Sequence, residues 1–471
     1  MTTPQEFDLI AIGGGPAGEK GSAQAAFFGK RVALVERLPW FGGAAVNTGT
    51  VPSKTLRETA LYFSGLRQRG LYGIDYSLRG GLTVADFLRH TEAVIEDQRR
   101  LIRENMERHR VAVFRGEGRF ADPKTIEVVA EDGTITTLTA PVILIATGSS
   151  PVRPPEIPFD DRIIYDSDSI LRMDRIPKTL AVVGGGVIGS EYASIFTALD
   201  VGVTLIDGRD RVLSFADHDI AARLRNRLES LGQKFIFGAR AAKTEIVGDG
   251  VRMTLTTGEV VTAERALFAA GRQSNVEGLQ LEKAGVTVGK RGLIPVDAKY
   301  QTNVPGIYAA GDVIGFPALA STSMEQARVA MVHAFDLRYK EQMSSTLPLA
   351  VYTVPEIGMV GLTEEEARKS GDDIETGVAE YRPNARAQII GDSYGLLKLV
   401  FRANDRKLLG VHIIGELASE LVHIGADVIR NGGTINAFID AVYNWPSISD
   451  SYKYAAYDGL IKLVRRGEAI H

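Results

Sequence analysis

Three glycines in fixed spacing, Gly13-x-Gly15-x-x-Gly18, follow the short apolar run Phe7–Ile12. A second apolar segment ends at Glu36, which is 23 residues after Gly13. Between a strand and a helix, such a motif binds a dinucleotide. Its glycines permit a tight turn, let the backbone approach the pyrophosphate and let helix and strand pack closely. The helix N-terminus then faces the phosphates, and Glu36 is placed to accept the ribose hydroxyls of an adenosine.

The same pattern recurs as Gly184-x-Gly186-x-x-Gly189, after the apolar run Leu180–Val183. Asp207 again follows the first glycine by 23 residues. One such motif is a weak signal, whereas two with matching strand, helix and acid spacing predict two dinucleotide sites. If the glycines served only to pack a helix against a strand, neither motif would need an acidic residue at the end of the strand that follows the helix.

The elements that must position these residues alternate between strand and helix. Further strands end in glycine-containing segments: Val142–Ala146 before Thr147-Gly148, Ala266–Ala270 before Gly271, and a third before Gly311-Asp312. Helices are expected at Gly21–Phe28, from about Thr322, at Glu364–Lys369 and at Ala418–Asn431.

This order predicts an α/β chain with two Rossmann-like dinucleotide-binding domains and a C-terminal α+β domain. A proline-rich stretch beginning at Pro151 favours a boundary there. The expected boundaries are 1–150 and 276–345 for the first dinucleotide domain in two parts, 151–275 for the second, and 346–471 for the C-terminal domain.

Composition excludes several classes of function. The 471 residues carry 54 Lys and Arg against 58 Asp and Glu, a net charge of −4, which offers no cationic surface for nucleic acid. No apolar run approaches the ~18 residues of a membrane-spanning helix, and the N-terminal segment resembles neither a secretory signal nor a transit peptide. We therefore expect a cytoplasmic protein without membrane insertion.

Cysteine is absent from the sequence, which excludes disulfides, thiolate nucleophiles, iron–sulfur clusters and cysteine-based zinc sites. The seven histidines include no close pair, so no metal site is expected either.

Taken together, these motifs resemble the flavoproteins with two dinucleotide sites that include glutathione reductase and dihydrolipoamide dehydrogenase. The resemblance covers nearly the whole chain, through GGGPAG with Glu36, GGAAVNTGTVPSK, ATGS, GGGVIGSE and YAAGD. It implies that the first glycine motif binds the ADP half of FAD, with Asp312 near the ribityl chain and pyrophosphate. It also implies that the second motif binds NAD(P)H and that the C-terminal domain forms a homodimer.

Two departures from that family carry information about function. The family's redox disulfide lies in G-G-x-C-x-N-x-G-C-x-P-S-K, but here Ala45 and Thr50 occupy the cysteine positions. Trp445 stands where the family's C-terminal His-Pro motif has its base. A dithiol relay needs both the thiols and the base. Their joint loss argues against reduction of lipoamide, glutathione, trypanothione or mercuric ion.

Within the family, the chain is most similar to the soluble pyridine nucleotide transhydrogenases, which have a threonine at the position of Thr50. Shared stretches include TVPSKTLR, YDSDSIL, SEYASIF and GDVIGFPALAS. Two alternatives stay open: an NAD(P)H:quinone reductase or diaphorase, which shares the Gly-Gly-Ala-Ala-Val start, and a flavin-bearing structural or sensor subunit. A quinone reductase would need an open cavity near Trp445 at the dimer interface.

Hydride transfer between nicotinamide and flavin needs stacking and orientation rather than a protein nucleophile. The resemblance implies that Lys54 lies beside the flavin, where it stabilises negative charge, and pairs with Glu191. The alternative is that both are ordinary surface residues, as these residue types usually are.

Nucleotide choice depends on the residues after the second acid. Asp207 favours NAD(H) through its ribose hydroxyls, whereas Arg209 and Arg211 suit the 2′-phosphate of NADP(H). Because the chain presents both, we expect it to accept both nucleotides. The alternative is that the arginines face solvent and the protein is specific for NADH.

Overall fold

The computed structural model describes residues 4–65 and 83–467. It divides into two compact units, each made of three segments of the chain. Unit 1 comprises Met1–Thr55, Leu88–Val152 and Gly271–Met343. Unit 2 comprises Leu56–Phe87, Arg153–Ala270 and Ser344–His471. The chain therefore leaves unit 1 after Val152 and re-enters it at Gly271.

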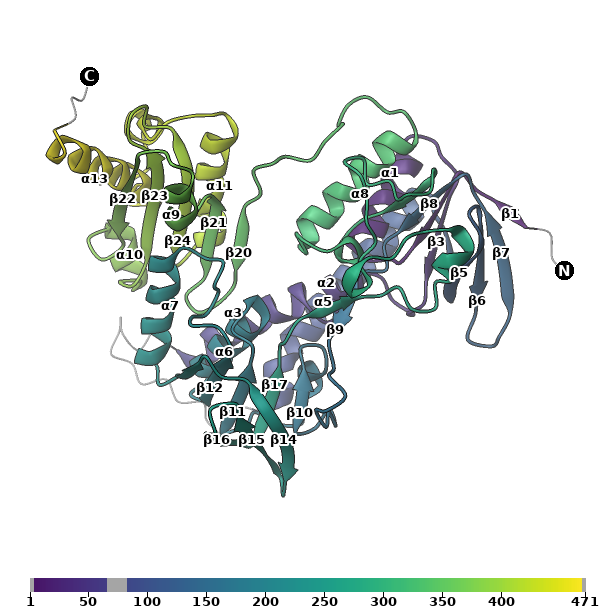
Figure 1. Cartoon of the computed structure of the whole chain (residues 1–471), viewed down its shortest axis with the longest axis horizontal. Helices are drawn as coiled ribbons and strands as arrows, with labels where there is room; N and C mark the ends of the chain where they lie inside the picture. Colours follow the sequence, from purple (N-terminus) through teal and green to yellow (C-terminus); the bar gives the residue numbers. More distant parts are fainter. Residues whose placement is uncertain (1–3, 66–82, 468–471) are drawn as a thin grey trace. The chain divides into compact units, whose positions relative to one another are not determined.

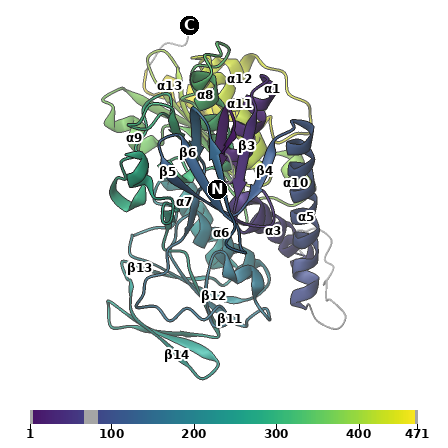
Figure 2. The same ribbon diagram turned by 90° about the vertical axis from the view of Figure 1, so that its right-hand side faces the viewer.

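A five-stranded parallel sheet, in the order β19-β8-β2-β3-β4, lies at the centre of unit 1. Its strands are β2 (Leu9–Ile12), β3 (Val32–Glu36), β4 (Ala112–Arg115), β8 (Val142–Ile145) and β19 (Ile307–Ala309). β3 and β4 run side by side at its edge (Figure 2). Every residue of the other four strands is buried, as expected for short apolar runs in a sheet covered on both faces.

Helices cover one face of this sheet and a smaller sheet covers the other. On the helical face, α1 (Pro16–Phe27) packs beside α8 (Ala320–Ala334), as Figure 1 shows. α1 begins at Pro16, so the expected start at Gly21 was wrong: proline has a backbone angle already suited to the first helical turn. On the other face, the strands β1 (Gln5–Glu6), β5 (Glu117–Asp122), β6 (Thr125–Val129) and β7 (Ile135–Thr139) form a sheet in the order β1-β7-β6-β5.

Three further helices follow β3 along the chain: α2 (Gly43–Asn47), α3 (Thr50–Ser64) and α5 (Val84–Arg108). α5 is amphipathic and packs Ile102 and Met106 into the core of unit 1. No helix among residues 4–65 and 83–467 is both long enough and apolar enough to cross a membrane.

The points where the chain leaves and re-enters unit 1 are joined by a short antiparallel pair. This pair consists of β9 (Ser149–Pro151) and β18 (Arg272–Ser274). We call it the crossover pair.

Unit 2 contains a second parallel sheet, in the order β10-β17-β11-β12-β13. Its strands are β10 (Ile164–Asp166), β11 (Thr179–Val183), β12 (Gly202–Asp207), β13 (Lys234–Phe237) and β17 (Arg265–Phe268). The helices α6 (Val187–Ala198) and α7 (His218–Ser230) belong to the same part. A three-stranded antiparallel sheet of β14 (Ala241–Val247), β15 (Gly250–Leu255) and β16 (Val260–Ala263) packs against it.

The C-terminal part of unit 2 is an antiparallel sheet, in the order β20-β21-β24-β23-β22. Its strands are β20 (Leu349–Val351), β21 (Ile357–Gly361), β22 (Ile374–Glu380), β23 (Leu396–Arg402) and β24 (Leu408–Ile414). Its helices are α9 (Glu364–Lys369), α10 (Ala385–Ile390), α11 (Ala418–Arg430), α12 (Asn436–Asp440) and α13 (Ser451–Arg465).

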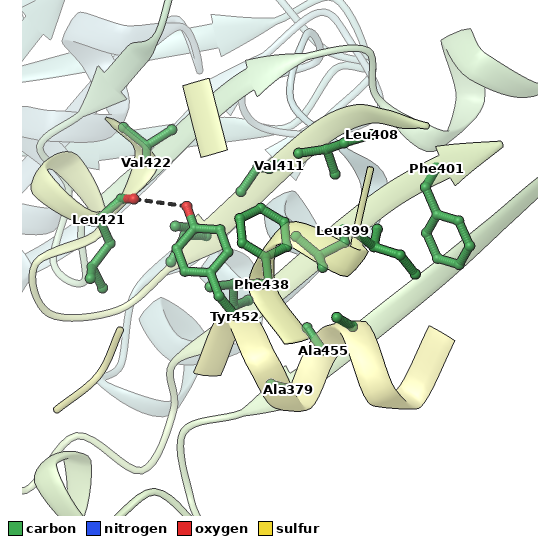
Figure 3. Packing of buried hydrophobic residues seen from close by; sticks show 14 of the residues in the cluster. Ala379, Leu399, Phe401, Leu408, Val411, Leu421, Val422, Phe438, Tyr452 and Ala455 are labelled. Carbon is green, nitrogen blue, oxygen red and sulfur yellow. Dashed lines mark hydrogen bonds between the residues drawn. The ribbon is translucent and has the colours of Figure 1, made fainter. Parts of the chain in front are cut away.

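Helices α11 and α13 enclose an apolar core with this sheet (Figure 3). At its centre, the hydroxyl of the buried Tyr452 donates a hydrogen bond to the carbonyl oxygen of Leu421 at 2.7 Å. The structure thus confirms the predicted α/β class, with two parallel sheets and a C-terminal α+β part.

Candidate functional site

The first glycine motif forms a tight loop at the carboxyl end of β2. Gly13 has a φ of +105°, and a Cβ there would lie 2.4 Å from the carbonyl oxygen of Ala146. A Cβ on Gly18 would lie 1.7 Å from the carbonyl oxygen of Gly13. At Gly15, by contrast, the nearest atom would be 3.6 Å away. The crowded positions bring α1 against β2, and the open one leaves room for a ligand to approach the backbone.

Glu36 holds the base of this loop from the end of β3. It is buried, and its Oε2 accepts a hydrogen bond from the backbone N–H of Gly14 at 2.7 Å. Its Oε1 accepts from the N–H of Leu38 at 2.8 Å. A carboxylate has about four acceptor sites, so Glu36 keeps acceptor capacity for ribose hydroxyls beside the loop.

The second motif repeats this geometry in unit 2. Gly184 has a φ of +109°, and a Cβ there would lie 2.5 Å from the carbonyl oxygen of Ala269. A Cβ on Gly189 would lie 1.8 Å from the carbonyl oxygen of Gly184. No atom lies within 4 Å of the Cβ position of Gly186. Two separate stretches of sequence therefore build the same loop, with the same residue left open at the N-terminus of a helix.

Asp207 lies at the end of β12 and is bound on two sides. It accepts from the backbone N–H of Gly185, as Glu36 does from Gly14. Arg209 adds three bonds: its backbone N–H donates to Oδ1 at 2.8 Å, its Nε to Oδ1 at 2.9 Å and its Nη2 to Oδ2 at 2.6 Å. Burial alone would raise the pKa of Asp207, but these bonds with Arg209 and the loop hold it below its usual value.

Arg209 and Arg211 differ in their surroundings. The guanidinium of Arg209 folds over Asp207 while its side chain stays 45% exposed. Arg211 turns to the carbonyl oxygen of Ser214 at 3.1 Å and to Glu365 at 3.7 Å. Of the two arginines, Arg209 is therefore the one placed at the acid that ends β12.

The remaining predicted residues of unit 1 gather at the carboxyl edge of its parallel sheet. Thr147 and Gly148 follow β8, and Gly311 and Asp312 follow the neighbouring strand β19. Gly271 precedes the crossover pair, which brings Ser149 to Asp312: its Oγ donates to Oδ2 at 2.7 Å. Thr147, Gly148, Gly311 and Asp312 lie on the same edge as the first glycine loop.

Lys54 and Glu191 lie in different units, so their pairing stays a prediction. Lys54 is on α3, where its Nζ donates to the Oγ of Ser53 at 3.2 Å. Glu191 is on α6 and is buried, so it is not an exposed helix-surface glutamate. Its Oε1 accepts from the backbone N–H of Tyr352 at 2.9 Å.

Sequence reasoning missed a buried lysine on β23. The Nζ of Lys398 lies 3.0 Å from Asp217, 2.7 Å from Asp219 and 2.7 Å from Glu364. Asp217 is the N-cap of α7 and Glu364 begins α9, so one ammonium group joins three elements. The available signal was a lysine inside the apolar run LLKLVF, because a buried lysine is almost always paired.

No cluster of three or more His, Asp or Glu side chains that could hold a metal ion occurs in the part of the chain that the structure describes. The sites that can be defined are thus the two glycine loops. Each has an acid at its base and a helix N-terminus behind it, which defines an α/β protein with two dinucleotide sites.

Comparison with known proteins extends this assignment. Residues 7–334 match the family model described as pyridine nucleotide-disulphide oxidoreductase, and residues 347–456 match its dimerisation domain. The chain belongs to this family of oxidoreductases.

Named relatives are similar over nearly the full length. A soluble pyridine nucleotide transhydrogenase of Mycobacterium bovis is 46% identical over 462 residues, 98% of each chain. One from Erwinia tasmaniensis is 39% identical, over 98% of this chain and 100% of the relative.

Two solved structures show the same fold. LpdA from Mycobacterium tuberculosis has a TM-score of 0.89 at 31% identity, covering 98% of this chain and all of that one. The HOCl-induced flavoprotein disulfide reductase RclA from Escherichia coli has a TM-score of 0.85 at 26% identity, covering 96% and 99%. RclA is named a disulfide reductase, whereas the present chain has no cysteine.

Proposed function

We propose that the protein transfers hydride from NADPH to NAD+ through bound FAD, giving NADP+ and NADH. The observation that carries this proposal is the pair of geometrically equivalent glycine loops in a chain without cysteine. Two dinucleotide sites and no thiol relay leave nucleotides as both donor and acceptor. The reaction is also the one named in its relatives from Mycobacterium bovis and Erwinia tasmaniensis.

We propose that the loop of unit 1 holds FAD, whose flavin supplies a group that can accept and return a hydride. The open position at Gly15 and the N-terminus of α1 suit a pyrophosphate. Glu36 suits the adenosine ribose, and Asp312 the ribityl chain. The further residues expected to line this site are Gly13, Gly18, Thr147, Gly148, Gly271 and Gly311.

We propose that the loop of unit 2 holds the nicotinamide nucleotides, with Gly186 at the pyrophosphate. Asp207 would accept the ribose hydroxyls of NAD(H), and Arg209 would bind the 2′-phosphate of NADP(H). Supporting this assignment, the acid and the arginine lie together at the end of β12.

We propose Lys54 as the residue that stabilises charge beside the flavin and Glu191 as its positioning partner. Replacing Lys54 with Met should slow flavin reduction by NADPH while FAD stays bound. Lys124→Met, at an exposed turn of unit 1, is the matched control. Stopped-flow absorbance measures the rate. A change within about twofold, or ~0.4 kcal/mol of barrier, would make Lys54 structural.

A second candidate is an NAD(P)H:quinone reductase, favoured by the exposure of Trp445, whose side chain is 76% accessible in the single chain. Enzyme reduced anaerobically with NADPH, then mixed with either thio-NAD+ or a benzoquinone, separates the two. Rapid reoxidation by thio-NAD+ supports the transhydrogenase. Reoxidation by the quinone alone supports the second candidate. For either activity we propose the cytosol as the compartment, in keeping with the absence of cysteine.

A further inference from the structure

We propose that Arg272 is a positioning residue for the cofactor: through Ser149, it fixes the carboxylate of Asp312. The Nε of Arg272 donates to the Oγ of Ser149 at 2.8 Å, and its Nη2 donates to the backbone oxygen of Ser149 at 2.7 Å. The same Oγ lies 2.7 Å from the Oδ2 of Asp312. This inference rests on the proposed FAD site, because Asp312 acts on the cofactor only there.

The chemistry of the three groups fixes the direction of the chain of bonds. A guanidinium has donors and no acceptor, so the hydroxyl of Ser149 must accept from Arg272. The single hydroxyl hydrogen is then left for Asp312, whose carboxylate can only accept. Arg272 therefore orients the hydroxyl as well as holding it. A bond donated by an oriented, polarised hydroxyl is stronger than one from a freely rotating hydroxyl.

The bonds between Arg272 and Ser149 also join the two strands of the crossover pair. Ser149 lies on β9 and Arg272 on β18, the two strands at which the chain leaves and re-enters unit 1. Asn275 strengthens the same pairing: its Nδ2 donates to the oxygen of Thr147 at 3.0 Å, and its Oδ1 accepts from Ser150 at 2.8 Å. The side chain of Asp312 is thus tied to both strands of the crossover pair.

The backbone of Asp312 is held separately. The N–H of Gly311 donates to the Oε1 of the buried Gln326 at 2.8 Å. Removing Ser149 or Arg272 should therefore leave the backbone at Asp312 in place and free only its carboxylate. The expected cost falls on cofactor affinity, because a group held in its binding geometry loses less entropy on binding.

The first test measures FAD affinity of the full-length chain freed of flavin, by fluorescence titration. Ser149→Ala and Arg272→Gln should each weaken FAD binding by about tenfold, the effect of one lost charge-assisted bond. Gln273→Ala is the matched control, since Gln273 is the exposed neighbour of Arg272 on β18. It should leave the affinity unchanged.

The double variant tests the order of the bonds. If Arg272 acts through Ser149, then Arg272→Gln in the Ser149→Ala background should change FAD affinity by less than about twofold. A full additional loss would overturn the proposal, because Arg272 would then act on the cofactor by another route. If Arg272→Gln does not fold, Arg272→Lys takes its place in both backgrounds, because lysine keeps the charge but lacks the rigid planar fork of the guanidinium.

A second readout follows from thermodynamic reciprocity. If Asp312 and the crossover pair are coupled, FAD must slow amide hydrogen exchange at Ser149, Ser150, Val152 and residues 272–274, and Arg272→Gln must abolish this slowing. FAD bound with equal affinity by all variants, and equal protection in each, would overturn the inference while leaving the proposed FAD site intact. A wild-type chain that binds no FAD would overturn the proposed function itself.

Discussion

The side chains of Asp207 and Arg209 are joined by two hydrogen bonds, so a nucleotide bound at the end of β12, as proposed, would meet both groups together. The low pKa of Asp207 keeps it ionised at neutral pH, although burial alone acts to raise that pKa. A bare carboxylate there would repel a 2′-phosphate. Because Arg209 pairs with this carboxylate and is itself partly exposed, the proposed site would offer an acid to NAD(H) and a guanidinium to NADP(H).

This arrangement predicts opposite effects for the two residues. Arg209→Ala should weaken NADPH more than NADH by about 1.5–3 kcal/mol, the range for a charge-assisted contact. Asp207→Ala should weaken NADH more than NADPH. Flavin reduction kinetics at fixed salt measure both, with Arg211→Ala as the control because Arg211 is bound to Ser214 and Glu365. Equal loss of both nucleotides in the Arg209 variant would contradict dual specificity.

At the scale of elements, the sequence predicted what short stretches encode. The glycine motifs, the buried parallel strands and helix α9 were found because their signals are local: residue spacing, apolar runs and, before α9, the sequence Thr363-x-x-Glu366. In the structure Thr363 and Glu366 form a capping box at the start of α9. The start of α1 was misplaced because the glycines that follow Pro16 are poor helix formers in isolation. In the folded chain, glycine at these positions lets α1 lie close to the sheet. A Cβ on Gly21, for example, would lie only 2.5 Å from the side chain of Leu144.

What the sequence could not show are bonds between distant segments. The 23-residue spacing from Gly184 predicted Asp207 at the end of its strand, and Arg209 was a candidate because it follows two residues later in the sequence. No local signal joins Ser149 to Asp312 across 163 positions, or Lys398 to Asp217 across 181. Such contacts depend on the strand order of the completed sheet, so only the structure reveals them.

A buried histidine beside Lys398 predicts a pH response for the elements around it. His412 lies opposite Lys398 on β24, and its Nε2 donates to the carbonyl oxygen of Leu362 at 2.9 Å. A proton must therefore add at Nδ1, which is buried and has no hydrogen-bond partner among the described residues. Burial lowers the pKa of His412 and Lys398 acts in the same direction, while Asp217 and Glu366 oppose them.

The lowered pKa predicts a loss of stability in mild acid. The unfolded histidine titrates near a pKa of about 6.5, so below that pH the unfolded chain binds more protons than the folded one. The free energy of unfolding should therefore decrease as the pH is lowered below about 6.5, by at most about 1.4 kcal/mol per pH unit for this one group.

His412→Gln should make the urea midpoint decrease less between pH 6.5 and pH 5.5 than it does in the wild-type chain. His423→Gln, at an exposed histidine of α11, should not change this decrease. Equal slopes in both variants would contradict the assignment. The depressed pKa of Asp217 acts separately, below about pH 4.

At the scale of the whole molecule, the C-terminal part presents an apolar surface that the single chain leaves exposed. Its helix α13 buries one face against the sheet, through Tyr452 and Ala455 (Figure 3) and through Leu463. The stripe on its other face is also apolar and exposed, at Tyr454, Tyr457, Ile461 and Val464. These four positions are three or four residues apart, so they form one continuous stripe. Exposed apolar stripes of this kind mark interfaces, and the match to the family's dimerisation domain begins at residue 347 and ends within α13.

We therefore expect the stripe on α13 to be covered by a second copy of the chain. Tyr457→Glu combined with Ile461→Glu places two charges in the stripe without touching the buried face, so the fold should survive while the dimer dissociates. The loss of one buried anchor at an interface commonly costs about 2 kcal/mol or more, and two together should raise the dimer dissociation constant by at least about a hundredfold. Sedimentation velocity over a range of concentrations measures that constant, and circular dichroism checks the fold. Leu101→Glu, an equally exposed apolar residue on α5, is the matched control. If the α13 variant and the control both remained dimers of unchanged affinity, the interface would lie elsewhere on the C-terminal part, with Val442 and Trp445 the next exposed apolar positions to test.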